Sequence, residues 1–595
     1  MGCLRDMKVI ATSRNMALPN FRGNYTHGTF IYTNDTHGTL GTLPYLISGV
    51  NQKQEELKDK SPITLSAGDE IMYINKLNPE LEFKRKQILV KLLNAMHLDV
   101  MTLGNHELDN GLQSLADVMK KAKFKILSTN AKISNTPLEQ TKEDGTLVKS
   151  YIFKNKDGEK YGILGVLPID EFSSEVSGET GDLIAGVPIN YYGSKEEIKA
   201  NIDERYNKTL NRLHKEVQKF ESEGINKIVL LSHLGYEKDR KIVNDDRING
   251  IDVIIGGHSH DKLNGFVYTD NGNNEKPNVF KTPEGKPIII TQAGSNANNF
   301  GVLDVLFDKN GVIASDKSGK IKGTNELLNS QDFEISAKLN KLIYSIFEET
   351  FKDTPEIGII SESIKPNTSR NRENTLVTAT LNGFVELAGK SGTDDIKDLD
   401  FAMIHASCAR GNLPKGDLNE GQLSLAFNFV RPFYKVKSSE KQIVDTINFM
   451  IEKGNLIGKC DIPQFSSNIR YQLIETTDDS GNKRLALSKL YINEKEVDIK
   501  HPNKTKIYKA AVDELYTDTN YFGESFNPKA GEPSQPCTDK NNNALDIVKG
   551  LADYLRNYCV DPETRELTFD VEPKNITVIE KSELPSSDKK LSFVA

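Results

Sequence analysis

Short apolar runs alternate with longer amphipathic stretches through the first half of the chain, and this pattern predicts an α/β domain. Runs rich in β-branched residues predict strands. These runs cover residues 29–33, 62–66, 99–103, 124–127, 161–166, 227–231, 252–255, 287–291 and 301–307. Apolar positions with the period of a helix cover residues 83–96 and 198–220.

Polar side chains follow shortly after five of the predicted strands. They are Asp35, Asp69, Asn105, His233 and His258. Open α/β sheets bind ligands beyond the carboxyl ends of their strands, because the loops at that edge converge on one place. We therefore expect these five side chains to lie close together.

The second half of the chain predicts a separate domain of mixed strands and helices. A polar stretch at residues 317–330 is typical of a boundary, and residues 335–351 form an amphipathic pattern that predicts a connecting helix. The expected divisions are an N-terminal extension (1–24), a first domain (25–325), a linker helix (326–352), a second domain (353–580) and a tail (581–595).

Length and charge limit the class of protein. With 595 residues the chain is too long for one core, so two large domains are expected. The net charge is −8 and no basic stripe occurs, which favours a small phosphate ester over a nucleic-acid polymer as the partner. No apolar run approaches the roughly 20 residues of a membrane span.

The five cysteines are widely scattered, and this pattern fits neither a zinc ribbon nor a dense disulfide framework. The N-terminus of the chain as given lacks the apolar segment of a secretory signal. We therefore expect no export signal in this sequence, while the compartment and the oligomeric state stay open.

The five polar segments together offer the ligands of two divalent metal ions. Two ions about 3.5–4 Å apart need one carboxylate that bridges them and further ligands on each side. We assign Asp69 as the bridge. The expected ligands are Asp35, His37 and His260 for the first ion, and Asn105, His233 and His258 for the second. This mixture of oxygen and imidazole ligands suits Zn, Mn, Fe or Co alike.

His106 directly follows a proposed ligand, and Asp109 lies three residues further on. If this segment starts a helical turn, the carboxylate of Asp109 can reach the imidazole of His106. Such a pair favours the charged imidazole, which would stabilise the transferring phosphoryl group or assist the leaving group. Each motif is weak alone, but five of them at strand ends form a specific set.

These residues resemble the calcineurin-like metallophosphoesterases, and more closely the two-domain 5′-nucleotidase family. The matching segments are NDTHG (34–38), SAGD (66–69), LGNHELDNG (103–111), LSHLG (231–235) and GGHSH (256–260). The resemblance implies a four-layer αββα sandwich, a linker helix and a second, mixed α/β substrate-binding domain. It also implies that Asp69 bridges the ions and that His106 and Asp109 form a catalytic dyad.

The second domain departs further from that family. The segment HASCAR (405–410) lacks the family's glycines but keeps Arg410, and RNRE (370–373) resembles a second phosphate-binding segment with Arg370. Pro432-Phe433 resembles the family's Pro-Phe, which implies that the Phe433 ring stacks on a nucleobase; Tyr521 or Phe522 is the candidate for the second stacking ring. Core packing is the alternative interpretation of both phenylalanines.

The leading hypothesis is hydrolysis of phosphate esters, above all nucleoside 5′-monophosphates to nucleoside and phosphate, by a hydroxide that bridges two metal ions. The altered second domain keeps other substrates open: cyclic nucleotides, UDP-sugars or a non-nucleotide ester. A binding protein that has lost its catalytic role is the alternative from another class. The complete set of seven proposed ligands speaks against it.

Overall fold

The computed structural model describes residues 25–580 with gaps, and everything below refers to that part of the chain. The gaps are residues 76, 144, 171–193, 270–274, 365–371, 391–395, 412, 414, 458–461, 478–482, 518–534, 540 and 570–574. The expected N-terminal extension (1–24) and tail (581–595) lie outside the described residues.

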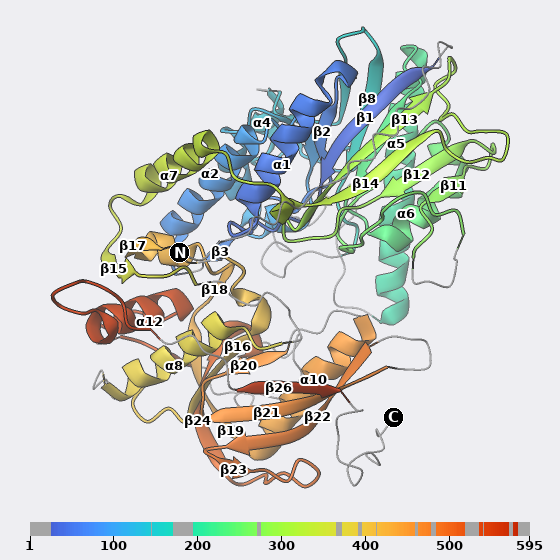
Figure 1. Ribbon diagram of the computed structural model, residues 1–595. Helices are drawn as coiled ribbons and strands as arrows, with labels where there is room; N and C mark the ends of the chain where they lie inside the picture. Colours follow the sequence, from blue (N-terminus) through green and yellow to red (C-terminus); the bar gives the residue numbers. More distant parts are fainter. Residues whose placement is uncertain are drawn as a thin grey trace, which may run out of the picture.

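Two β-sheets pack face to face in the first domain (Figure 1). Buried side chains from both sheets, such as Phe30, Leu65, Ile163 and Leu231, form the layer between them. The first sheet has the order β14 (Gly323–Asn329), β13 (Asn299–Phe307), β1 (Thr26–Thr33), β2 (Ile63–Ser66), β4 (Val100–Thr102), β5 (Lys125–Leu127) and β6 (Leu147–Val148). The second has the order β11 (Val279–Lys281), β12 (Pro287–Thr291), β10 (Val253–Gly256), β9 (Ile228–Ser232), β8 (Lys160–Val166) and β7 (Ser150–Lys154).

Helices cover the outer faces of both sheets. On the first sheet lie α1 (Leu43–Glu56), α2 (Pro79–Ala95) and α3 (Gly111–Met119); on the second lie α5 (Lys195–Ser222) and α6 (Tyr236–Val243). A short helix, α4 (Glu139–Glu143), precedes β6. The predicted four-layer αββα sandwich is confirmed.

Local sequence signals explain where the two long predicted helices begin. Pro79 stands at the start of α2, and the side chain of Asn78 accepts a hydrogen bond from the amide of Leu81. At the start of α5, Ser194 and Glu197 form a reciprocal capping box, which satisfies amides that have no partner inside the helix.

The region between the domains differs in part from the expected boundary. The polar stretch at 317–330 contains β14, an edge strand that pairs antiparallel with β13. Polar residues suit a strand at this position, because its outer edge faces water. Helix α7 (Ala337–Phe351) follows and packs on α1 and α2, with Leu339, Ile343 and Ile346 buried in the core of the first domain.

The second domain contains two larger mixed sheets. One has the order β20 (Pro463–Phe465), β16 (Phe401–His405), β24 (Ile507–Asp513), β19 (Phe433–Ser439) and β25 (Gln535–Pro536). The other has the order β23 (Lys495–Glu496), β22 (Lys483–Ile492), β21 (Ile469–Thr477) and β26 (Ile576–Glu580). A small pair joins β15 (Glu356–Ile360) and β17 (Gly416–Asn419). The helices are α8 (Thr375–Lys390), α9 (Glu420–Ser424), α10 (Glu440–Ile457) and α12 (Ile547–Tyr554).

The two domains are joined directly by backbone pairing. Strand β3 (Ile74–Asn75) of the first domain pairs in parallel with β18 (Phe429–Val430) of the second. Beside this pair, the fully buried guanidinium of Arg85 on α2 donates to the carbonyls of Ser424 and Phe427. These contacts hold residues 424–430 of the second domain against the first domain.

Candidate metal centre

The proposed metal ligands lie just beyond the carboxyl ends of β1, β2, β4, β9 and β10. In the first sheet β1, β2 and β4 are parallel neighbours, and in the second sheet β9 and β10 are parallel neighbours. Their carboxyl ends therefore deliver five loops to one place. The structure brings all seven proposed ligands together there: Asp35, His37, Asp69, Asn105, His233, His258 and His260.

Five of these ligands have left-handed backbone conformations, which side chains other than glycine rarely adopt. The φ angles are 50° at Asp35, 51° at His37, 57° at Asp69, 74° at His258 and 60° at His260. Strain of this kind persists only where surrounding contacts impose it, and it concentrates at functional sites.

The carboxylate of Asp69 lies between two imidazoles that belong to the two proposed sites. Its Oδ2 is 3.1 Å from Nε2 of His233 and 3.6 Å from Nε2 of His37. On the first-site side, Oδ1 of Asp35 lies 3.2 Å from Nε2 of His260. This placement is the one that a bridging carboxylate requires.

The remaining proposed ligands of the second site also meet. Nδ1 of His258 lies 3.1 Å from Oδ1 of Asn105, and the rings of His233 and His258 are 5.2 Å apart. The amide of His258 is within hydrogen-bond distance of the carboxylate of Asp35, at 2.9 Å from Oδ2, so the backbone of one segment orients the ligand of another.

His233 tests whether a metal ion fits these residues. Its Nδ1 lies 2.6 Å from the carbonyl oxygen of Ala67, so Nδ1 carries the ring hydrogen and Nε2 of the neutral imidazole carries a lone pair. That Nε2 is buried without a hydrogen-bond partner, although it faces Oδ2 of Asp69. Two atoms with lone pairs that face each other in a buried site need a cation, and a ligand histidine usually donates its other ring N–H in this way.

The electrostatics of the site favour cations. Burial alone raises the pKa of Asp35, but His260 and His233 outweigh this effect and hold the pKa below its usual range. Burial lowers the pKa of His233, yet Asp69 and Asp35 together raise it to about 10. The buried carboxylates therefore create a field that stabilises positive charge, whether on a proton or on a metal ion.

His106 and Asp109 form a hydrogen-bonded pair next to the proposed ligands. Residues His106–Leu108 make one turn of 3₁₀ helix, which places Nδ1 of His106 2.7 Å from Oδ2 of Asp109. Burial lowers the pKa of His106, but Asp109 and Asp69 reverse this effect and raise the pKa to about 9. The His106 ring lies 5.4 Å from that of His37, so the pair borders the first proposed site.

Glu107 connects the two loops that carry the proposed ligands Asp69 and Asn105. Its carboxylate accepts hydrogen bonds from the backbone amides of Asp69, Glu70, Ile71 and Gly104, at 2.7–3.0 Å. Gly104 has no side chain here because a Cβ would overlap the carboxylate of Asp69. This residue pair therefore fixes the unusual backbone that carries the proposed bridge.

The proposed substrate-binding residues of the second domain lie in different places in the structure. Arg410 lies at the centre: its Nη1 donates to Oδ1 of Asn296 at 3.3 Å, and the same oxygen lies 3.3 Å from Nδ1 of His37. Phe433 is fully buried, and its ring packs on Phe384 with centroids 4.7 Å apart. The structure therefore does not bring Phe433 to the centre. Arg370, Tyr521 and Phe522 lie outside the described residues.

A different phenylalanine, Phe429, faces the metal centre. Its ring centroid is 6.4 Å from that of His106 and 5.6 Å from that of His405. The guanidinium carbons of Arg410 and Arg431 lie 5.4 Å and 5.3 Å from the ring centroid. No local sequence pattern singles out Phe429 or Arg431, whereas the Pro-Phe pair at 432–433 favours Phe433 as the stacking ring.

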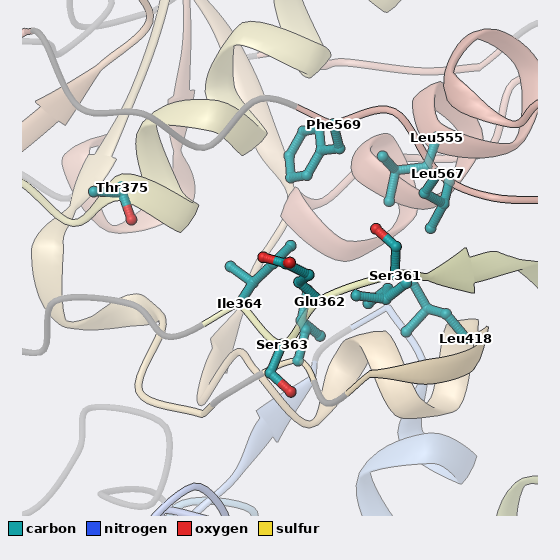
Figure 2. A pocket seen from close by; sticks show the side chains of 11 residues that line it. Ser361, Glu362, Ser363, Ile364, Thr375, Leu418, Leu555, Leu567 and Phe569 are labelled. Carbon is teal, nitrogen blue, oxygen red and sulfur yellow. The ribbon is translucent and has the colours of Figure 1, made fainter. Parts of the chain in front are cut away.

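A cavity of about 330 Å³ lies elsewhere in the second domain (Figure 2). It shares no lining residue with the proposed metal site or with the Phe429 cluster, and it does not belong to this centre. Its lining is mostly apolar, with Ile360, Ile364, Leu413, Leu418, Leu555, Leu567 and Phe569 beside the polar residues Ser361, Glu362, Ser363 and Thr375.

Comparison with known proteins defines the class of this fold and site. Residues 28–262 match the family model of calcineurin-like phosphoesterases. The chain is 25% identical over 495 residues to an NAD 5′-nucleotidase of Haemophilus influenzae, covering 74% of each chain. Residues 28–262 therefore form a calcineurin-like phosphoesterase domain, and the chain as a whole is similar to two-domain 5′-nucleotidases.

A solved structure supports the two-domain fold. The 5′-nucleotidase precursor of Thermus thermophilus matches with a TM-score of 0.59 and 20% identity, over 93% of this chain and 99% of that one. The chain is also 24% identical over 450 residues to the trifunctional nucleotide phosphoesterase YfkN of Bacillus subtilis, which covers 70% of this chain and 27% of the relative. The chain thus spans half or less of the length of several curated relatives that it matches, between 27% and 50%.

The match of residues 28–262 to the calcineurin-like phosphoesterases implies divalent metal ions at a dinuclear centre, and the residues described above supply candidate ligands. Within the described part of the chain, none of the helices combines the length and the apolar character needed to cross a bilayer.

Proposed function

We propose that the chain hydrolyses phosphomonoesters with two divalent ions, Zn, Mn, Fe or Co, and that nucleoside 5′-monophosphates are the first substrates to test. The observation that carries the proposal is the position of Asp69, whose Oδ2 faces Nε2 of both His233 and His37. When bound, two divalent ions supply an activated water and neutralise phosphate charge.

His106 would act on the leaving group. Its Nδ1 is hydrogen-bonded to Asp109, so the other ring nitrogen can present a proton to the oxygen that departs from phosphorus. The carboxylate of Asp109 is buried and holds the imidazole in one orientation, in the manner of other oriented acid–base pairs.

Arg410 would bind the phosphate from the side of the second domain. The residue is only 6% exposed, and its guanidinium is held by the carbonyl of Ser407 and by Asn296, which fixes its direction before the substrate arrives. A guanidinium matches the geometry of two phosphate oxygens. Phe429, which lies beside it, would contact the organic part of the ester.

Names of relatives support the choice of nucleotides. They include a human 5′-nucleotidase, 30% identical over 261 residues, and the NAD 5′-nucleotidase of Haemophilus influenzae. The proposal transfers that substrate class to this chain because an arginine and an aromatic ring adjoin the metal centre, a combination that suits a phosphate joined to a flat group.

Phosphate release from AMP and from p-nitrophenyl phosphate tests the proposal. The metal-loaded protein should release phosphate, and a chelator should abolish the reaction until Mn or Zn is restored. Asp69→Asn and His106→Gln should each lower kcat by at least about a hundredfold, whereas Asp59→Asn, an exposed carboxylate far from the centre, should leave it unchanged. The absence of phosphate release from every ester, with each of the four metals present, would contradict the proposal.

A further inference from the structure

Arg431 is a buried cation for which the proposed reaction has no role. The residue is only 9% exposed, and its Nη1 is buried without a hydrogen-bond partner. Among the described residues, no carboxylate forms an ion pair with Arg431; its one charge-related contact is with the ring of Phe429, at 5.3 Å from the centroid.

An unpaired guanidinium in such a place is costly. Removing a charged group from water without a partner is unfavourable, and a cation over a phenylalanine ring offsets only part of that cost. The free protein therefore keeps a destabilising feature, which is the pattern expected when a ligand supplies the missing partner.

The position of Arg431 indicates which ligand that is. Arg410 and Arg431 lie at nearly the same distance from the Phe429 ring. Arg410, however, is fixed by Asn296 and Ser407 next to His37, whereas among the described residues no hydrogen bond or ion pair fixes the side chain of Arg431. The guanidinium of Arg410 is thus held at the metal centre. The guanidinium of Arg431 can bind a group of the same ligand that lies further from the metal centre.

We propose that Arg431 forms a second anion subsite, which binds a phosphate or another oxyanion carried by the leaving group of the substrate. The inference rests on the proposed function and deepens it: the favoured substrates carry a second negative group beyond the phosphate that is hydrolysed. A guanidinium can donate two parallel hydrogen bonds to such an oxyanion.

Binding experiments test the subsite without turnover. The probes are the phosphonate analogue of AMP, in which a methylene group replaces the 5′ oxygen, and a non-hydrolysable methylene analogue of ADP, and the readout is calorimetry on the metal-loaded protein. Arg431→Gln should weaken binding of the doubly charged analogue about ten- to hundredfold, because a charged hydrogen-bonding partner is lost. Binding of the AMP phosphonate should change less than about threefold, and Arg431→Lys should retain part of the preference for the doubly charged analogue.

Kinetics on wild-type protein, Arg431→Gln and the surface control Arg470→Gln locate the second anion. The substrates are AMP, ADP and adenosine 3′,5′-bisphosphate, so that the second phosphate lies either next to the scissile phosphate or across the ribose. Loss of kcat/KM that is confined to one or both doubly charged substrates supports the subsite. An equal loss for AMP would overturn it, because Arg431 would then serve the scissile phosphate itself.

Stability separates this role from a structural one. If the partner of Arg431 is an anion supplied by the ligand, Arg431→Gln should leave the melting temperature of the ligand-free protein unchanged or raise it. A clear fall in melting temperature with unchanged binding of the ADP analogue would overturn the proposal. Failure of the wild-type protein to hydrolyse any ester would count against the proposed function alone, because the binding measurement would still decide the subsite.

Discussion

The side-chain amide of Asn428, in the second domain, donates a hydrogen bond of 2.6 Å to the backbone carbonyl of His37, a proposed metal ligand in the first domain. Asn428 is fully buried, and its Oδ1 accepts from Arg85 at 3.2 Å. A residue next to Phe429 is thus bonded to the backbone of the metal centre. The aromatic ring and the candidate centre are therefore positioned by the same contact.

Replacement of Asn428 by alanine should destabilise the contact between the two domains. It leaves the carbonyl of His37 and one nitrogen of Arg85 buried without a partner, which costs about 1–3 kcal/mol for each unsatisfied group. We expect urea unfolding to show a decrease of about that size in the free energy of unfolding, and we expect the rate of phosphate release to fall. Asn541→Ala, an exposed asparagine of the second domain, is the control; equal behaviour of the two variants would show that the contact contributes nothing.

Phe429 and Phe433 should respond in opposite ways to truncation. Phe433 is buried against Phe384, so Phe433→Ala should cost about 3–5 kcal/mol of stability with little change in KM for AMP. Phe429 is partly exposed and faces His106, so Phe429→Ala should raise KM for AMP severalfold at nearly constant stability. Denaturant unfolding and initial-rate kinetics on both variants give the comparison, and the reverse pattern would assign the substrate contact to Phe433.

The positions of Phe429 and Phe433 show which features of the structure the sequence predicts and which it does not. The strands and the convergence of the seven proposed ligands follow from local patterns, because each ligand comes shortly after a buried strand, whereas the sandwich was expected only from the family resemblance. The approach of Phe429 and Arg431 depends on how a second domain docks onto the first, and pairing between β3 and β18 is a long-range event with no periodic signal. Edge strand β14 was missed for a related reason: polar composition suits both an exposed edge and a linker.

Asp546 should make stability depend on pH. It caps α12 and is buried, and burial raises its pKa from 3.8 to about 6. Between those values the folded state binds more protons than the unfolded state, so the contribution of this group to stability falls as pH rises and is constant above about pH 6. The rise in pH lowers the contribution of Asp546 to the free energy of unfolding by about 2–3 kcal/mol in total.

Asp546→Asn removes that titration while it keeps a good capping side chain. We expect the gain in stability of the variant over the wild type to be larger at pH 8 than at pH 4.5 by about 2 kcal/mol, as measured by urea unfolding at both values. Asp59→Asn, an exposed carboxylate, should give no such difference. A stability change of Asp546→Asn that is the same at both pH values would contradict the assignment.

Glu107 should control metal affinity without touching the metal ions. Its two oxygens accept from four backbone amides, among them those of Asp69 and Gly104. In Glu107→Gln one oxygen becomes an NH₂ group that faces amide donors, so at least one pair of hydrogen bonds is lost and the loop that carries Asp69 loosens. Groups that orient a ligand typically contribute ten- to hundredfold to metal affinity. We therefore expect titration with Mn to show weaker binding by about that factor, while Glu55→Gln on the exposed end of α1 should bind as the wild type does. Unchanged Mn affinity in Glu107→Gln would mean that the backbone around Asp69 holds its left-handed conformation without this carboxylate.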